Sequence, residues 1–191
     1  MDRQVIVLTH DLSFMRFLVD IHKQILTTNC ELLGIDKYNG FSGIVSDEIP
    51  YLAKNVDERI SSIRKILVEH DALQIHDAHG RETKLDSARK RFRMLIERSV
   101  EEILSNKSYE RFSKNIHLKK VYLSSYVVTQ QSDVDFILGL FGKYSITEHD
   151  GGTSIIPLLP SRDIIHQDIT DYLAWKLDFK NRLRTFQQTY N

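Results

Sequence analysis

Apolar residues near the beginning of the chain predict a short buried strand, then a helix and a β-hairpin. Residues 5–8 are Val-Ile-Val-Leu. This run is too short for a buried helix, and its β-branched side chains are typical of a strand covered on both faces of a parallel sheet. Over residues 12–28 the apolar side chains recur at helical spacing. Two extended runs then flank Asn39-Gly40, which favours a hairpin because both turn positions adopt positive φ.

After Pro50 the apolar side chains follow helical periodicity almost to the end of the chain. Asn55 and Glu58 have the spacing of a capping box. Helices are expected at about 56–68, 84–104 and 134–144, in shorter pieces at 109–113 and 118–126 (with 121–128 extended as the alternative), and from Ser161 onward. The predicted fold class is therefore α+β, mostly α. A strand-helix-hairpin segment over residues 1–48 is followed by a helical domain over 49–191.

Two stretches of the helical part are expected to be irregular. Residues 69–84 are polar and contain Gly80, which predicts a loop or a frayed helix, and residues 149–160 contain two glycines and two prolines, which predicts a loop. The predicted core faces comprise Val56, Ile60, Ile63 and Leu67; Leu85, Ala88, Phe92, Leu95, Ile96, Ser99, Val100 and Ile103; Phe136, Ile137, Leu140 and Phe141; and Ile165, Ile169, Tyr172, Leu173, Trp175, Leu177, Phe179, Leu183 and Phe186.

Bulk composition excludes little. Lys and Arg number 26 and Asp and Glu also number 26, so the net charge of zero gives no argument for nucleic acid or a membrane surface. A single cysteine, Cys30, allows no internal disulfide and favours a reducing compartment. No apolar run approaches the roughly 20 residues that span a bilayer, and the opening residues lack the pattern of a signal peptide. We expect a cytoplasmic location with no membrane partner.

Three polar residues, Thr9-His10-Asp11, follow the predicted strand at its carboxyl end. In open α/β sheets ligands bind outside the carboxyl ends of the strands. Asp11 can also cap the helix that follows. A side chain at the position of His10 is therefore a candidate for function, the alternative being a polar residue that merely ends a strand.

The segment VIVLTHDLSFM resembles the switch-histidine segment, or H-loop, of ABC-type ATPases, especially the SMC-like AAA family ATPases of bacterial DNA repair and phage defence. Further segments are similar to the parts of those proteins that follow the H-loop, namely residues 43–50, 98–104, 110–112 and 149–150 and the last helix with Trp175. The resemblance implies that His10 contacts the γ-phosphate of ATP, with Thr9 and Asp11 beside it at the nucleotide.

The sequence lacks the other parts of such an ATPase. It has no G-x-x-x-x-G-K-[ST] phosphate loop, no apolar strand that ends in an acidic pair for Mg²⁺, and no LSGG-like signature. Phosphoryl transfer depends on charges positioned around the phosphates and the metal, so this chain alone is not expected to hydrolyse ATP. ATP and Mg²⁺ are expected only in the complete ATPase, with an upstream ATPase half or another subunit as the partner. A chain that starts directly at the strand favours truncation.

Four residues suggest an alternative function, a metal-free ribonuclease-like helical domain. Arg98 and Glu102 are four residues apart, and Arg111 and His117 have an Arg-x5-His spacing. Both patterns resemble the RNA-cleaving helical domains of anticodon nucleases, in which an arginine would hold the phosphate while a histidine and a glutamate move protons. The structural alternative is an internal salt bridge or a helix cap.

A histidine cluster could bind a metal ion but is not predicted to do so. His70, His76 and His79 lie close to Asp71 and Asp77 in the sequence, and imidazole and carboxylate are zinc ligands. Because the cluster falls in a polar connection, where histidines are usually solvated, we predict no metal site. His149-Asp150 is a second polar pair, either catalytic or part of a turn.

A run of basic residues could contact phosphates. Its members are Arg81, Lys84, Arg89, Lys90, Arg91 and Arg93. Acidic residues interrupt the run and aromatic residues are scarce, so a solvated helix face is the favoured interpretation. Nucleic acid and a second copy of the chain remain candidate partners. A third interpretation of the whole chain is a non-catalytic protein-binding or nucleic-acid-binding module.

Overall fold

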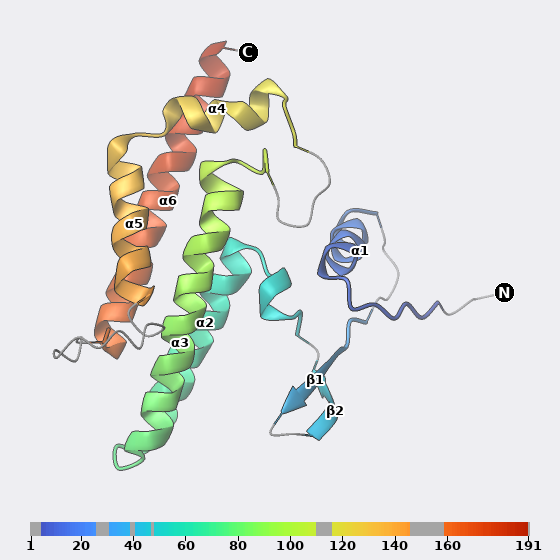
Figure 1. The fold of residues 1–191 in the computed structure, drawn as a ribbon, viewed down its shortest axis with the longest axis vertical. Coiled ribbons are helices and arrows are strands. Elements are labelled where there is room, and N and C mark those ends of the chain that lie inside the picture. Colours follow the sequence, from blue (N-terminus) through green and yellow to red (C-terminus); the bar gives the residue numbers. More distant parts are fainter. Residues whose placement is uncertain are drawn as a thin grey trace. The chain divides into compact units, whose positions relative to one another are not determined.

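The chain forms two compact units, Met1–Lys54 and Asn55–Asn191, whereas the sequence placed the division between residues 48 and 49. The computed structural model describes residues 5–25, 31–38, 41–46, 48–109, 116–145 and 159–190. Helices dominate, and the strands of the described residues form a single antiparallel pair (Figure 1). The predicted fold class, α+β and mostly α, is confirmed.

The first unit contains helix α1 (Leu12–Ile25), strands β1 (Gly34–Tyr38) and β2 (Phe41–Ser46), and a 3₁₀ turn η1 (Tyr51–Ala53). The hairpin predicted around Asn39-Gly40 is formed, with Ile35 opposite Val45, although those two turn residues lie outside the described part. The register is interrupted after Asp36, and Gly43 has a φ of 86°. A bulge at this point needs positive φ, which glycine adopts at little cost.

The strand expected over residues 5–8 is not formed, so that prediction is wrong for this chain by itself. These residues are extended but pair with no strand of the described part, and all four are exposed. A strand needs a neighbour to satisfy its backbone hydrogen bonds. The apolar pattern shows that residues 5–8 are suited to a buried strand. The described residues provide no neighbouring strand with which they could pair.

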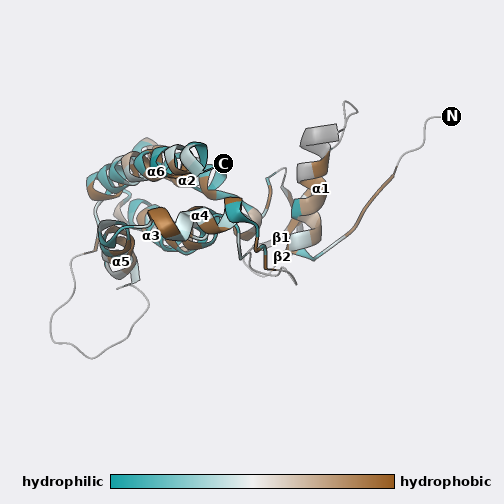
Figure 2. Cartoon of the chain, turned by 90° about the horizontal axis from the view of Figure 1, so that it is seen from above, coloured by the Kyte–Doolittle hydropathy of each residue, from teal (hydrophilic) through white to brown (hydrophobic). Residues whose placement is uncertain are grey.

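The second unit is built from helices α2 (Val56–Ala72), α3 (Ala78–Ser99), α4 (Lys120–Val128), α5 (Gln131–Ser145) and α6 (Arg162–Tyr190), with a π-helical turn at Val100–Leu104 after α3. Seen from above, α2 and α6 lie in one layer and α3 and α5 in the other (Figure 2). None of the helices in the described residues is long and apolar enough to cross a membrane.

Helix α2 begins at the predicted capping box, which is confirmed. The Asn55 side chain accepts from the backbone N–H of Glu58, and the Glu58 side chain accepts from the backbone N–H of Asn55, each at 2.9 Å. The last helix begins after Ser161, as expected, with the Ser161 hydroxyl 3.4 Å from the Ile164 nitrogen. Both starts are local, so the sequence is enough to locate them.

The loop or frayed helix expected over residues 69–84 is much shorter than predicted. Helix α2 continues to Ala72 and α3 starts at Ala78. The Asp77 carboxylate accepts from the Gly80 N–H at 2.9 Å and caps α3. Arg81 of α3 donates to the carbonyls of His70 and Leu73 at the end of α2. Arg81 thus satisfies backbone carbonyls at the end of α2 that have no partner within that helix.

The core lies between the helices of the second unit and contains most of the predicted positions. Phe92 of α3 stacks on Tyr144 of α5 with ring centroids 4.2 Å apart, and both side chains are fully buried. Val100 and Leu177 were expected in the core but are 46% and 62% exposed. Val100 opens the π-helical turn, where the helical spacing changes, and Leu177 lies outside the buried stripe of α6.

Candidate functional site

The first candidate site is the segment that leads into α1. Val5, Ile6, Val7 and Leu8 are 81%, 75%, 50% and 86% exposed. Soluble domains seldom leave a continuous aliphatic run in water, and such a run marks a surface that binds something apolar. Burying each of these side chains against a partner would contribute roughly 1.5–3 kcal/mol.

Hydrogen bonds from side chains to the backbone fix the turn between this segment and α1. The Asp11 carboxylate accepts from the N–H groups of Ser13 and Phe14 at 2.8 and 3.0 Å, so Asp11 caps α1 as predicted. The Thr9 hydroxyl accepts from the Asp11 N–H at 3.0 Å. The backbone of His10 is therefore held between an extended segment and the first turn of a helix.

The His10 imidazole is exposed and has no hydrogen-bond or ion-pair partner among the residues that the structure describes. Imidazole donates a hydrogen bond from either nitrogen, depending on its tautomer, and from both when protonated. The His10 ring can therefore donate a hydrogen bond to an anionic ligand.

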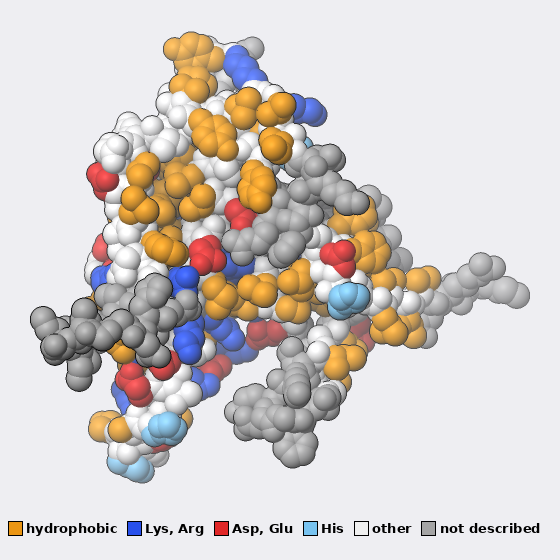
Figure 3. All heavy atoms as spheres, viewed as in Figure 1, with side chains coloured by type: hydrophobic (Ala, Val, Ile, Leu, Met, Phe, Trp, Pro, Cys, Tyr) orange, Lys and Arg blue, Asp and Glu red, His pale blue; other side chains and the backbone are white. Residues whose placement is uncertain are grey.

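Exposed apolar side chains continue over the rest of the first unit. Phe17 of α1 is 59% exposed, and Ile35 and Val45 of the hairpin are 70% and 62% exposed. Within the described part of this unit, Ala53 is the one buried apolar side chain. Figure 3 shows apolar side chains, coloured orange, at the surface of the unit that carries the N-terminal segment. The first unit lacks an apolar core of its own in the described residues.

The structure brings together two of the four residues proposed for a ribonuclease. Arg98 Nε lies 3.4 Å from Glu102 Oε2, and Arg98 also pairs with Glu101 at 2.9 Å. Glu102 Oε2 accepts from the backbone N–H of Val56 at 3.2 Å. Glu102 therefore joins the π-helical turn after α3 to the first residue of α2, as expected for the structural alternative of a salt bridge or cap.

The other two residues of that set cannot be joined to this pair. Arg111 lies outside the described residues. The His117 backbone donates to the Ser108 carbonyl at 2.8 Å, and its ring centroid lies 5.1 Å from that of Tyr122. None of the contacts among the described residues joins His117 to Arg98 or Glu102.

The histidine cluster is dispersed. His70 is buried and its Nδ1 lies 2.9 Å from Asp71, which Arg162 also binds at 2.7 Å. The Arg162 and His70 hydrogen bonds hold the pKa of Asp71 below its usual value. His76 and His79 are exposed. In the part of the chain that the structure describes, no three His, Cys, Asp or Glu side chains come close enough to hold a metal ion. His149-Asp150 lies outside that part.

The basic run on α3 is not a uniform solvated face, and Arg89 corrects that expectation. Its side chain is only 3% exposed, and its guanidinium binds the Pro160 carbonyl at 2.9 Å, Glu82 at 2.6 Å and Asp86 at 3.0 Å. Lys84 pairs with Glu69 at 2.6 Å. Arg89 therefore connects parts of the bundle and is not available to phosphates.

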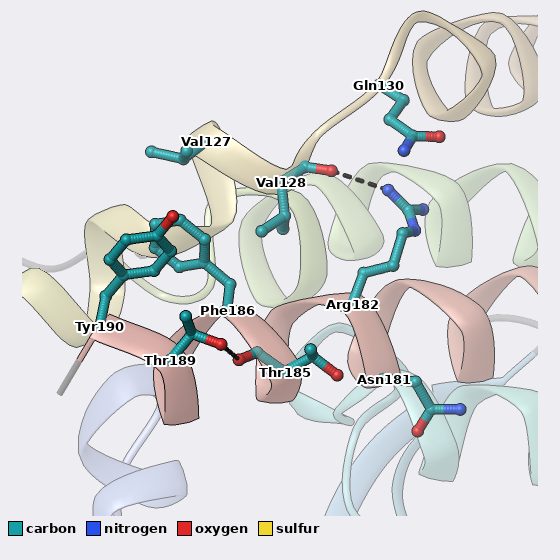
Figure 4. A pocket seen from close by; sticks show the side chains of 9 residues that line it. All are labelled: Val127, Val128, Gln130, Asn181, Arg182, Thr185, Phe186, Thr189 and Tyr190. Carbon is teal, nitrogen blue, oxygen red and sulfur yellow. Dashed lines mark hydrogen bonds between the residues drawn. The ribbon is translucent and has the colours of Figure 1, made fainter.

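Sequence reasoning missed a pocket of about 570 Å³ between α4 and the last turns of α6 (Figure 4). Its side chains come from Val127, Val128, Gln130, Asn181, Arg182, Thr185, Phe186, Thr189 and Tyr190. A local signal was available, because residues 116–132 and 179–190 contain no Asp or Glu, unlike the mixed charge elsewhere.

Comparison with known proteins identifies no family for this chain. No family model matches the chain, and no match was found among the curated proteins or the solved structures. A functional assignment therefore depends on the residues, their contacts and the resemblance of the H-loop segment.

Proposed function

We propose that this chain is the C-terminal part of an SMC-like ABC-type ATPase of DNA repair or defence, and that it does not hydrolyse ATP alone. The exposed aliphatic segment at residues 5–8, followed by His10 and a helix capped by Asp11, carries this proposal. An H-loop requires this order of strand, histidine and helix. The strand in question still needs a sheet, which the ATP-binding half would provide.

The residues of this chain have distinct tasks in the proposed site. Residues 5–8 pair with the edge of the partner sheet and bury their side chains, which places His10 at the carboxyl end of the new strand. Asp11 and Thr9 keep the turn after the strand fixed through their hydrogen bonds. The His10 imidazole donates a hydrogen bond to the terminal phosphate and orients it.

When bound, ATP would supply the terminal phosphate that His10 is proposed to contact. The exposed imidazole fits this task, since it is a donor without a competing partner among the described residues. Mg²⁺ would be held by the ATP-binding half, together with the nucleotide. In the complete ATPase, the helical unit would couple the nucleotide state to a partner or to nucleic acid.

The first experiment looks for the missing half. The DNA that precedes the codon for Met1 should encode a G-x-x-x-x-G-K-[ST] segment. That half and this chain are then produced together and assayed for ATP hydrolysis. Removing one hydrogen-bond donor from a transition state costs about 10²–10³-fold in kcat, so we expect a loss of this size for His10→Ala. His76→Ala, an exposed histidine of the helical unit, is the matched control.

The second experiment tests the strand. Ile6→Lys places a charge in the segment that would be buried, so this chain should no longer co-purify with the ATP-binding half. Ile75→Lys is the control, because Ile75 is 90% exposed in the connection between α2 and α3. The proposal fails if the preceding DNA encodes no phosphate loop, if His10→Ala keeps full activity, or if Ile6→Lys still co-purifies.

A further inference from the structure

Helix α4 buries small polar side chains and exposes large apolar ones. A helix on the surface of a globular domain normally turns its apolar stripe toward the core. In α4 the buried side chains are Ser124 and Ser125, which are 4% and 0% exposed. Leu123, Tyr126 and Val127 are instead 36%, 55% and 67% exposed. Both serine hydroxyls donate to backbone carbonyls of α4 itself, so they can be buried against the bundle while the apolar side faces outward.

The outward side of α4 lies between two hollows of the surface. Val127 lines the pocket between α4 and α6. Tyr126 and Thr129 line a second pocket of about 800 Å³, together with Val100 of the π-helical turn and Tyr109. Figure 3 shows orange, apolar side chains at the surface over α4. This region therefore offers a projecting helix and an apolar hollow beside it.

Opposite charges lie at the two ends of α4. Lys119 is exposed and directly precedes the first turn of α4. The second pocket, at the other end of α4, is also lined by Glu97 and Glu101. The Glu97 side chain is 32% exposed and lies 3.7 Å from Arg93. Because a carboxylate can accept about four hydrogen bonds, Glu97 can accept from a further cation. We call α4 and the second pocket the α4 surface.

We propose that the α4 surface is the interface of a two-fold symmetric dimer, in which the α4 helices of two copies lie antiparallel. In such an interface, if residue i contacts residue j, then j contacts i. Lys119, Leu123 and Tyr126 follow helical spacing along the outward side of α4. The first half of this stripe in one copy lies over the second pocket of the other copy, where Lys119 meets Glu97 and Leu123 meets Tyr126.

The exposed apolar area agrees with an interface of ordinary size. An aromatic side chain has about 150–250 Å² of surface, so one that is half exposed offers on the order of 100 Å². Val100, Tyr109, Leu123, Tyr126 and Val127 are 36% to 67% exposed and together offer on the order of 400–500 Å². A typical interface buries about 800 Å² per partner, of which rather more than half is apolar.

Charge favours a second copy in this orientation over other occupants. Parallel α4 helices would place Lys119 beside Lys119, and like charges across an interface are unfavourable. An anionic membrane or a nucleic acid would bring phosphates against Glu97 and Glu101. The antiparallel dimer is the arrangement that matches both ends of α4 at once.

This inference goes beyond the proposed ATPase function and does not depend on it. The α4 surface belongs to the second unit and uses none of residues 5–11. The test uses the full chain without ATP and without the ATP-binding half. Ile6→Lys, which should prevent binding of that half, should leave the dimer intact.

The experiment is sedimentation velocity of the full chain over a range of concentrations. We expect a species of twice the 22.3 kDa of one copy, with a dissociation constant that is micromolar or tighter, as is usual for interfaces of this size. Val127→Glu buries a charge in the interface and should weaken the dimer by about 100-fold or more. Val68→Glu is the matched control, because Val68 is 68% exposed on α2, and it should leave the dimer unchanged.

A charge exchange tests the orientation. Lys119→Glu replaces two symmetry-related attractions by repulsions and should weaken the dimer roughly tenfold. Adding Glu97→Lys to the same chain should restore it, because each pair is then reversed rather than lost. Lys90→Glu, at an exposed position of α3, should have no effect. Circular dichroism verifies that each variant keeps its helices.

Four outcomes would overturn the inference. The first is that the chain stays monomeric at every concentration; binding of this monomer to vesicles of phosphatidylserine and phosphatidylcholine would then assign the α4 surface to a membrane. The second is that folded Val127→Glu dimerises as tightly as the unchanged chain. The third is that Ile6→Lys abolishes the dimer, which would assign it to residues 5–8. The fourth is that the charge exchange fails to restore the dimer.

Discussion

The most informative single substitution is Asp133→Ala, because Asp133 connects α5 to α6 and only 2% of it is exposed. Its carboxylate accepts from two Arg182 nitrogens at 2.6 and 3.0 Å and from the Trp175 indole N–H at 2.9 Å. It also accepts from the backbone N–H of Gln130 at 2.7 Å, at the start of α5. Removing it leaves several donors unsatisfied at once.

The size of the effect follows from these contacts. Removing one partner of a buried ion pair costs about 3–5 kcal/mol, because the other charge stays buried without compensation. Arg182 keeps two further contacts, with Asp178 at 2.8 Å and with the Val128 carbonyl at 2.7 Å. We therefore expect Asp133→Ala to lower the free energy of unfolding by about 3 kcal/mol, the lower end of that range.

The assay is urea denaturation followed by the helical circular dichroism signal, with the midpoint and the slope fitted together. Asp135→Ala is the matched control. Asp135 is exposed on the same helix, and its carboxylate accepts from the Gln131 amide at 2.8 Å. It should cost less than about 0.5 kcal/mol, as surface substitutions usually do. A loss below about 1 kcal/mol for Asp133→Ala would refute the reasoning.

The same network predicts a dependence on pH. Burial alone would raise the pKa of Asp133, but the hydrogen bonds from Arg182, the Gln130 backbone and Trp175 outweigh it and hold the pKa below the ordinary 3.8. Because the folded-state pKa is the lower one, this stabilisation is complete above the unfolded-state pKa and disappears as pH falls through the folded-state value. The stability difference between the unchanged chain and Asp133→Asn should therefore shrink below about pH 4.

Two further substitutions test the bundle. Phe92→Ala removes a fully buried ring stacked on Tyr144 and should cost about 3–5 kcal/mol in urea denaturation. Phe92→Leu keeps most of the volume and should cost clearly less, so equal losses for the two would contradict the packing argument. Asn55→Ala removes the cap of α2 and should cost about 1 kcal/mol. Asn55→Asp should restore most of it, and a neutral Asn55→Ala would show that the cap contributes nothing.

Local physics explains which elements the sequence determined. The cap at Asn55 and the helical stripe from Val56 to Leu67 depend on residues within one or two turns, so both are visible without a structure. The hairpin is equally local, because a two-residue turn brings β1 and β2 together. The functional hypothesis for His10 also came from a local pattern, and Asp11 does cap the helix that follows it.

Only the tertiary structure decided which charged side chains pair across different helices and loops. Arg182 binds Asp133 across 49 positions of the chain, and Arg89 reaches the Pro160 carbonyl across 71. Sequence spacing identifies partners one helical turn apart, and no comparable rule relates residues on helices that meet only in the bundle. For this reason Arg89 was expected in solvent, and the pocket between α4 and α6 was not predicted, because the two helices meet only in the bundle.

Residues 5–8 show most clearly the difference between what the sequence determines and what the tertiary structure decides. Its β-branched composition determines that it suits a buried strand, since side-chain shape and hydrophobicity belong to the residues themselves. Whether it becomes a strand depends on a neighbouring edge with free N–H and C=O groups, which the described residues do not supply. Sequence thus set the preference of these four residues, and only three-dimensional pairing could decide whether that preference is satisfied.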